Sequence, residues 1–236
     1  NCNGFNIRNS TTSDLIIGTT NSLNIKNTKI NGLLKLIDEE YKSITIDDCS
    51  IESIVEINKV DNLEINKTVL KSSLSLIANK YKFVCIVDSK ILDFNVTELS
   101  SLIIKKTTIN GIIKLEGVIE KDVLFDNVEF KKECVFPKIE NLDIINKTIF
   151  YKEAEFDALN SLNISKTIFE KQIKFNNDCS KAKFDECYFK GELFMPNISH
   201  LDIKSSTFEK DIDFNDKKYT VININSCLFN ENLNFQ

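Results

Sequence analysis

A pattern of about 20 residues repeats along the chain, and it constrains the fold more than any other feature. Each copy opens with a segment of the form L-x-I-x-x-T-x-I, and successive copies begin 18 to 21 residues apart. The segments begin at Leu23, Ile44, Leu63, Val84, Leu102, Val123, Leu142, Leu162, Ala182, Leu201 and Ile222. Phe5-Asn-Ile7 adds one unit upstream, which makes twelve. Repeats of this length are typical of solenoids, in which each unit packs only against its neighbours.

Each unit contains three short stretches in which apolar and polar residues alternate. One unit shows them clearly as Leu162-Asn-Ile164, Thr167-Ile-Phe169 and Ile173-Lys-Phe175. Alternation with a period of two predicts β-strands that bury one face. Both prolines, Pro137 and Pro196, fall in the mostly polar connector that follows the third stretch. The sequence therefore predicts an all-β parallel β-solenoid of about twelve coils, forming one domain over residues 1–236 because no linker interrupts the pattern.

Two positions of the repeat predict columns of buried side chains. A small column holds mostly hydroxyl or thiol groups: Thr28, Cys49, Thr68, Ser89, Thr107, Thr148, Thr167, Cys187, Ser206 and Cys227. A large column is aliphatic and then aromatic: Ile30, Ile51, Leu70, Ile91, Ile109, Phe130, Phe150, Phe169, Phe189, Phe208 and Phe229. The change comes near Val123, and we expect the phenylalanines to stack in offset fashion.

Part of this pattern resembles the pentapeptide-repeat proteins. Phe208-Glu-Lys-Asp-Ile-Asp-Phe214 and Phe169-Glu-Lys-Gln-Ile-Lys-Phe175 are similar to the F-x-x-x-hydrophobic-x-F units of that family. Leu201-Asp-Ile203 resembles the A-[DN]-L core of the family, although a large Leu replaces the small Ala. The resemblance implies a right-handed β-helix with a four-sided coil, and the large residues leave a rounder or more triangular coil open. A leucine-rich repeat is the alternative fold, since its pattern also fits Leu159 to Phe169.

The sequence offers little for catalysis or for binding a cofactor or metal. His200 is the only histidine, so neither a Ser-His-Asp triad with a second base nor a His-rich metal site can form. Asn31-Gly32 and Asn110-Gly111 predict turns, and no glycine-rich phosphate loop is present. The seven cysteines lack C-x-x-C spacing, which favours small buried residues in a reducing compartment over a disulfide framework. We therefore predict a non-enzymatic protein that needs no cofactor.

Charge and hydropathy limit the partners that the chain can have. The net charge of −5 gives no reason to expect direct nucleic-acid binding, and no apolar run is long enough for a transmembrane helix. Some pentapeptide-repeat proteins mimic DNA and inhibit type II topoisomerases, which is the alternative function. The corner after the first strand does not favour mimicry, because its charges alternate in sign from coil to coil, beginning with Lys26, Asp47 and Lys67. We expect these charges to form a ladder of ion pairs.

Outward apolar residues give the one positive indication of function. The middle residue of the second strand becomes apolar or aromatic at Ile149, Ile168 and Tyr188, and again at Leu228. Phe194, like Val135, is an outward apolar residue of the third strand. A stacked apolar column is less common on a surface than scattered apolar residues, so we predict a partner surface of these residues. The leading hypothesis is a scaffold that binds another protein.

The last coil of the chain predicts an association with another copy or a missing segment. A solenoid exposes a strand edge and an apolar cross-section at each end, and no helix or polar cap follows the last coil from Ile222 to Phe235. We therefore expect two copies to stack C-terminus to C-terminus, or a further segment to have been cut from the chain. No signal peptide is visible, so a cytoplasmic location is expected.

Overall fold

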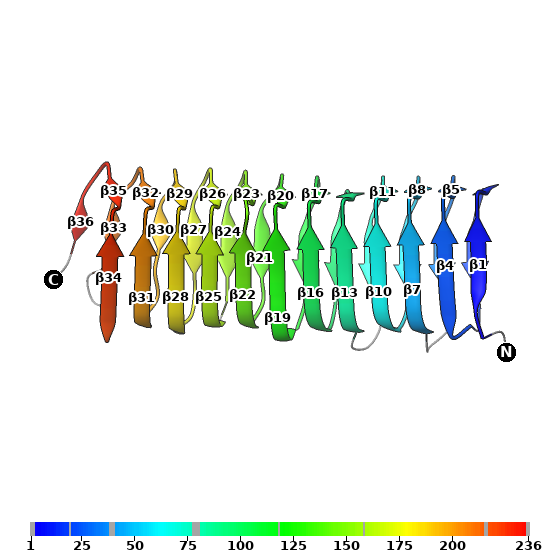
Figure 1. Ribbon diagram of the computed structural model, residues 1–236, viewed down its shortest axis with the longest axis horizontal. Helices are drawn as coiled ribbons and strands as arrows, with labels where there is room; N and C mark the ends of the chain where they lie inside the picture. The colour runs from blue at the N-terminus through cyan, green and yellow to red at the C-terminus, as the bar shows by residue number, and fades with distance from the viewer. Residues whose placement is uncertain are drawn as a thin grey trace. The chain divides into compact units, whose positions relative to one another are not determined.

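The computed structural model describes residues 3–18, 20–37, 41–76, 81–117, 119–157, 159–214 and 217–234. The described part contains strands and no helix (Figure 1). It divides into two compact units, unit 1 (Asn1–Val118) and unit 2 (Ile119–Gln236). The prediction of one domain over residues 1–236 is not tested by this division and stays a prediction.

Unit 1 contains three sheets, each with one strand from every coil. The first sheet contains β1 (Phe5–Arg8), β4 (Ser22–Lys26), β7 (Tyr41–Asp47), β10 (Val60–Asn66), β13 (Tyr81–Val87) and β16 (Leu99–Lys105). The second sheet contains β2 (Thr11–Thr12), β5 (Lys29–Ile30), β8 (Ser50–Ile51), β11 (Val69–Leu70), β14 (Lys90–Ile91) and β17 (Thr108–Ile109). The third sheet contains β3 (Leu15–Ile17), β6 (Leu34–Leu36), β9 (Val55–Ile57), β12 (Leu74–Leu76), β15 (Phe94–Val96) and β18 (Ile113–Leu115).

Unit 2 repeats the arrangement, with one difference in its third set of strands. Its first sheet contains β19 (Ile119–Asp126), β22 (Ile139–Ile145), β25 (Leu159–Ser165), β28 (Cys179–Asp185), β31 (Ile198–Lys204) and β34 (Val221–Asn225). Its second sheet contains β20 (Glu129–Phe130), β23 (Ile149–Phe150), β26 (Ile168–Phe169), β29 (Tyr188–Phe189), β32 (Thr207–Phe208) and β35 (Leu228–Phe229). The third set contains β21 (Cys134–Phe136), β24 (Ala154–Phe156), β27 (Ile173–Phe175) and β30 (Leu193–Phe194), and then β33 (Ile212–Asp213) and β36 (Leu233–Asn234), which pair only with each other.

Parallel pairing in the register of the repeat confirms the predicted fold class. Leu63, for example, lies opposite Ile44 of the preceding coil and Val84 of the next. The chain is an all-β parallel β-solenoid of about 11 turns of ~20 residues, since twelve first strands mark eleven complete steps. No described segment after the strands is helical, so the structure does not support the leucine-rich-repeat alternative.

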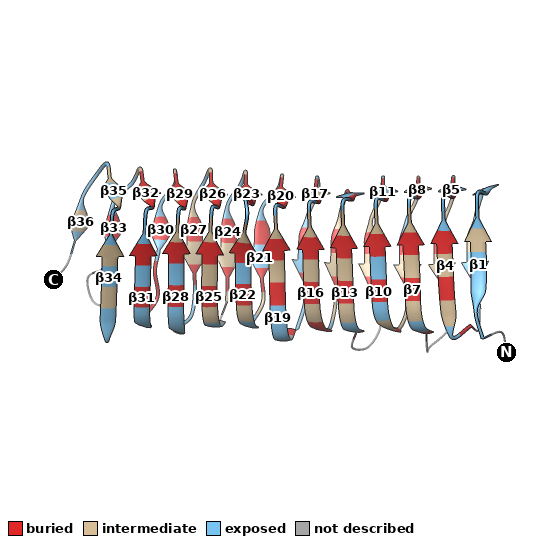
Figure 2. Cartoon of the chain, viewed as in Figure 1, coloured by how far each residue is buried: buried red, intermediate tan, exposed pale blue. Residues whose placement is uncertain are grey.

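The two predicted columns lie in the core (Figure 2). In unit 2, Phe130, Phe150, Phe169, Phe189 and Phe208 are each 1% exposed. Their rings stack on one another with centroids 4.6 to 5.0 Å apart, which confirms the expected ladder. The pattern continues to the last coil, where Phe229 is half-buried and stacks on Phe208 at 5.1 Å.

A second column of phenylalanine rings lies beside the first ladder in unit 2. Phe136 stacks on Phe156 at 4.7 Å, and both meet the first ladder edge to face. Cys134 and Ala154 begin the third strands of these coils, where unit 1 has larger residues such as Leu74 and Phe94. Smaller residues here offset the volume of the added rings.

Most hydroxyl groups of the small column both donate and accept a hydrogen bond at the first corner. The Thr68 hydroxyl donates to the Asn66 carbonyl at 2.8 Å and accepts the Cys49 N–H at 3.3 Å. Ser89 repeats the arrangement, since its hydroxyl accepts the Thr68 N–H at 3.1 Å. The hydroxyls therefore satisfy buried main-chain groups that the corner removes from the strand ladder.

The same corner contains residues in the left-handed backbone region, which the repeat pattern did not reveal. Thirteen described non-glycine residues have positive φ, and they include Asn27 at 47° and Lys67 at 47°. All except Asn146 occupy the position before the small column, and the N–H of most of them donates to the next coil, as Asn27 does to the Asp47 carbonyl at 3.0 Å. Six of the thirteen are Asn or Asp, which tolerate this conformation best.

The two predicted Asn-Gly turns of unit 1 have a common steric basis. A Cβ atom on Gly32 would lie 1.9 Å from an Asp14 carboxylate oxygen, and one on Gly111 would lie 2.0 Å from Asp93. Those carboxylates accept the N–H of the residue after each glycine at 2.8 Å. A Cβ atom would also lie 2.8 Å from the Ser13 carbonyl oxygen at Gly32 and 2.6 Å from the Leu92 carbonyl oxygen at Gly111, so the main chain of the preceding coil requires glycine.

Candidate functional site

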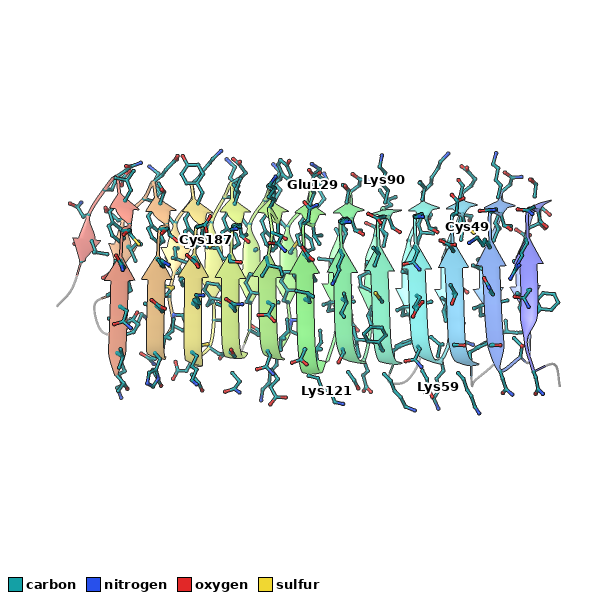
Figure 3. The ribbon with its side chains drawn as sticks, in the orientation of Figure 1. Cys49, Lys59, Lys90, Lys121, Glu129 and Cys187 are labelled. Atoms are coloured by element: carbon teal, nitrogen blue, oxygen red, sulfur yellow. The ribbon has the colours of Figure 1, made fainter. Side chains whose placement is uncertain are left out.

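The candidate site is the outer column of unit 2, which we define as the outward residues of its second sheet. In register it consists of Glu129, Ile149, Ile168, Tyr188, Thr207 and Leu228. The first of these, Glu129, is labelled at the outer edge of the ribbon in Figure 3. Short strands with one buried phenylalanine each position this column, because the residue before the phenylalanine must point outward.

Four of the five residues predicted as a partner surface belong to this column. Ile149, Ile168 and Tyr188 are half-buried, and Leu228 is 56% exposed. Thr207, which the sequence analysis did not single out, fills the position between Tyr188 and Leu228. The column therefore presents three consecutive large apolar or aromatic side chains and a fourth after one threonine.

Phe194, the fifth predicted residue, lies elsewhere. It belongs to β30 in the third set of strands and is 45% exposed. Together with Lys174, Met195 and Lys210 it lines an open cleft of about 640 Å³. Phe194 therefore lies in a different set of strands from the outer column, as expected from its place in the third strand, and its part in a partner surface stays a prediction. Val135, 57% exposed, lies on the Phe194 side.

Charged and aromatic groups form a rim along one side of the outer column. We define the rim as Lys131, Tyr151, Glu170, Lys190 and Glu209, which all lie two residues beyond the column. Lys131 lies 3.7 Å from the centre of the Tyr151 ring, a cation–π contact. Lys190 donates to both oxygens of Glu170 at 2.8 and 2.9 Å. An apolar centre bordered by polar groups is the usual anatomy of a protein interface.

Tyr188 connects the outer column to this rim. Its hydroxyl donates to Glu209 on the next coil, and the Lys190 ammonium lies 5.5 Å from its ring centre. The hydrogen bond to Glu209 raises the pKa of Tyr188, and the bond to Glu170 raises the pKa of Lys190. These contacts hold the aromatic ring in one orientation.

A second apolar surface, in unit 1, was missed by the sequence analysis. On β13, Phe83, Cys85 and Val87 point outward and are half-buried, and Ile103 lies opposite Cys85 on β16. The signal was available, because the segment Phe83 to Val87 is apolar at inward and outward positions alike. A strand that is apolar on both faces is typical of a sheet covered on both sides.

The predicted ladder of ion pairs forms only in part at the first corner. Among the described corner residues, Lys26 pairs with Asp47 at 2.8 Å and Lys166 with Glu186 at 3.9 Å. Other coil-to-coil pairs lie on different faces, as Lys35 with Glu56 does at 2.7 Å. Main-chain bonds of the left-handed residues join the coils at this corner, and side-chain charges contribute little there.

The groups that the sequence analysis considered for chemistry lie apart from one another. Lys181 lies opposite His200, and both line a shallow depression of about 410 Å³ on the outer face of the first sheet. Cys187, labelled within the ribbon of Figure 3, and Cys134 are buried, which raises the pKa of each thiol to about 12. Within the described ranges, no group of three or more His, Cys, Asp and Glu residues could hold a metal ion.

The comparisons with known proteins add no relative. No family model matches the chain, and neither a curated protein nor a solved structure matches it. In the part of the chain that the structure describes, no helix is long and apolar enough to cross a membrane.

Proposed function

We propose that this protein is a non-enzymatic scaffold that binds another protein through the outer column of unit 2. The observation that carries the proposal is the run of Ile149, Ile168 and Tyr188 on successive coils, in register and partly open to solvent. The equivalent positions of unit 1 hold Lys29, Ser50, Val69, Lys90 and Thr108. The apolar run is therefore a property of this part of the chain and not of the repeat.

The spacing of the column supports a flat, extended contact. Coils of a β-solenoid are about 4.8 Å apart, so the three residues from Ile149 to Tyr188 span roughly 10 Å of apolar surface. Tyrosine and large aliphatic residues at the centre of an interface, with charged groups at the rim, contribute most of the binding energy in protein complexes. We place the protein in the cytoplasm, since its cysteines suit a reducing compartment.

We also propose a relationship to the pentapeptide-repeat proteins. The supporting residues are the F-x-x-x-hydrophobic-x-F segments, in which Phe169 and Phe175, and likewise Phe208 and Phe214, are buried. The large first-pair residues such as Leu201 depart from that family's small alanine. The topoisomerase-inhibiting function of some family members is not part of the proposal, because no feature of the structure favours it.

A triple variant tests the proposed function. Ile149→Ser, Ile168→Ser and Tyr188→Ser together should abolish enrichment of the partner in affinity purification from the source cells, quantified by mass spectrometry. The matched control is Val69→Ser, Lys90→Ser and Thr108→Ser, which changes equivalent positions of unit 1 and should leave enrichment unchanged.

Thermal unfolding of both triple variants separates binding from folding. We expect both to keep a cooperative transition, since the substituted side chains point outward. Equal loss of enrichment in both variants, or no loss in either, would contradict the proposal.

A further inference from the structure

Exposed lysines border the outer column on both sides at the two coils that carry Ile149 and Ile168. One lysine of each coil lies two residues before the column, and another lies three residues after it, beyond the rim. We define the flanking lysines as these four exposed residues: Lys147, Lys152, Lys166 and Lys171. The two isoleucines between them are half-buried. An apolar pair on adjacent coils is therefore enclosed by four positive charges.

The register of the coils places like charges next to each other. The column is paired with an offset of 19 residues here, which puts Lys147 beside Lys166 and Lys152 beside Lys171. Lys147 N–H also donates to the Lys166 carbonyl at 2.8 Å, and Lys132 extends the second row by one coil. Coils are about 4.8 Å apart, and like charges at that spacing repel each other. A carboxylate placed beside each pair removes this repulsion.

The chain itself supplies few acids to balance these lysines. The segments 146–153 and 165–172 contain four lysines and two glutamates, Glu153 and Glu170. Glu170 is already bonded to Lys190 at 2.8 Å. Within the described ranges, Lys166 meets Glu186 at 3.9 Å, and the other three flanking lysines form no ion pair. A net positive charge therefore remains around the two isoleucines.

Unit 1 has a different arrangement at the same positions of the coil. Two residues before its outward positions, the charge alternates over three coils as Asp48, Lys67 and Asp88. Three residues after those positions, the coils of Val69 and Lys90 have Ser72 and Asp93. Two parallel rows of lysine thus accompany the apolar pair of unit 2 and are not a general property of the repeat.

Both lysine rows end at the coil of Tyr188. Glu186 and Gly191 take the two positions there, and the Tyr188 hydroxyl donates to Glu209. The positive region therefore covers the Ile149 and Ile168 part of the column, and the tyrosine end is polar without excess positive charge.

We infer that the partner presents an acidic segment to Ile149 and Ile168, with Asp or Glu residues on both sides of bulky apolar side chains. This inference rests on the proposed function, because it names the chemistry of the partner that the outer column binds. The apolar side chains of the segment pack on the isoleucines, and its carboxylates lie beside the flanking lysines. Charges around an apolar contact raise the association rate and exclude partners of the wrong charge.

The charge of the whole chain favours a protein segment over larger anionic surfaces. A membrane of anionic lipids or a nucleic acid faces much more of the chain than two coils, and the net charge of −5 repels both. A nucleic-acid backbone also offers no apolar group to the isoleucines. A short acidic segment meets only the positive region.

Peptide display on the full chain tests the inference with a defined probe. A phage-displayed library of random linear peptides is selected against the wild type and against a charge-reversed variant, in which all four flanking lysines become Glu. Glutamate is compatible with the left-handed corner, since Glu186 occupies it at φ 54°. The wild type should select peptides with Asp and Glu around bulky apolar residues, and the variant should select Lys and Arg there.

A matched variant of unit 1 controls for the change in total charge. It replaces four exposed lysines around the second sheet of unit 1 by Glu: Lys67, Lys71, Lys90 and Lys106. This control should select the same acidic peptides as the wild type. A variant with all four flanking lysines changed to Gln keeps the test valid if charge reversal prevents folding. A selected peptide should bind the Gln variant about tenfold more weakly than the wild type at low salt, and the difference should shrink at high salt.

The outcomes separate this inference from the proposed function. Selected peptides that lose binding to the Ile149→Ser, Ile168→Ser and Tyr188→Ser triple variant but show no excess of Asp and Glu would overturn the inference alone. Acidic peptides that bind this triple variant as well as the wild type would contradict the proposed function. Failure to select any acidic peptide, with binding of phosphatidylserine vesicles or duplex DNA that requires the flanking lysines, would overturn the inference in favour of those surfaces.

Discussion

The two units build the same coil from different side chains. The large column of unit 1 is aliphatic, from Ile30 to Ile109, whereas that of unit 2 is a stack of phenylalanines from Phe130 to Phe229. Backbone register, left-handed corners and hydroxyl bonds are the same in both. The comparison teaches that main-chain hydrogen bonds determine the shape of the coil. A core side chain needs only to pack well against the side chains at the same position of the two neighbouring coils.

The units also differ in the hydrogen bonding of their tyrosine hydroxyl groups. In unit 1, the Tyr41 hydroxyl donates to the Ile17 and Gly18 carbonyls at 2.9 and 2.8 Å, and Tyr81 repeats this with Ile57 and Asn58. In unit 2, the Tyr219 hydroxyl oxygen is buried and finds no hydrogen-bond partner among the residues that the structure describes. Burial raises the pKa of Tyr219 to about 12. The same side chain therefore stabilises one unit and costs free energy in the other.

The largest expected effect comes from removing one ring of the aromatic ladder. Phe169→Ala should lower the free energy of unfolding by about 3–5 kcal/mol, because Phe150 and Phe189 stack on both sides and cannot fill the cavity. Ile168→Ala, the outward neighbour, should cost less than about 1 kcal/mol. Urea unfolding measures both. An unchanged midpoint for Phe169→Ala would mean that the inward register is wrong.

The tyrosine comparison predicts opposite results for one substitution. Tyr81→Phe should cost about 1–3 kcal/mol, since it removes a buried donor from two carbonyls. Tyr219→Phe should be neutral or stabilising by up to about 1 kcal/mol, because it removes an unsatisfied hydroxyl. Thermal unfolding of the two variants checks the difference. If Tyr219→Phe proved the more damaging of the two, the hydroxyl would have a partner and the comparison would fail.

The hydroxyl column offers a smaller test that can raise stability. Unit 2 has Val128 in this column, fully buried, where the other coils have Thr, Ser or Cys. Val128→Thr should stabilise by about 0.5–1 kcal/mol by supplying the missing bond to the Asp126 carbonyl, and Thr68→Val should destabilise by about 1–2 kcal/mol. Unfolding by guanidinium measures both changes, and equal effects of the same sign would rule out the proposed role of the hydroxyl.

The smallest expected effect concerns Tyr188 at high pH. Its pKa is raised above the ordinary 10.0 because the hydroxyl donates to Glu209, so the protonated form is favoured in the fold. The stability that this bond contributes is present below pH 10 and is lost as the pH rises through the raised value. Unfolding at pH 8 and pH 11 should show a slightly steeper loss for wild type than for Tyr188→Phe. An identical pH dependence would mean that the bond does not form in solution.

The repeat made the fold predictable, but it did not predict the backbone conformation of the corners. Alternation at residues such as Leu162 and Ile164 identifies strands and register from one sequence, because the side-chain period of a strand is two. The left-handed residues vary among Asn, Asp, Lys, Glu and Ser, so no residue type reveals them. Ion pairing was overestimated at the same place, since exposed charges gain little from pairing and the main chain already joins the coils.

The candidate site was predictable only as a pattern of outward residues. Ile149, Ile168 and Tyr188 precede phenylalanines that must point inward, which fixes their direction from sequence alone. Phe194 has the same local alternation, and its place in the third set of strands separates it from the others. The hydrogen bond from Tyr188 to Glu209 joins residues 21 apart, which a sequence pattern does not reveal.

Direct contact at the outer column is the central claim, and site-specific photo-crosslinking tests it best. Thr207 in unit 2 and Thr108 in unit 1 occupy the same position of the coil and are both half-buried. A photoreactive amino acid at position 207 should give one covalent adduct with the partner in source cells, and the same group at position 108 should give none. Equal adducts from both positions, or an adduct from position 108 alone, would contradict binding by the outer column.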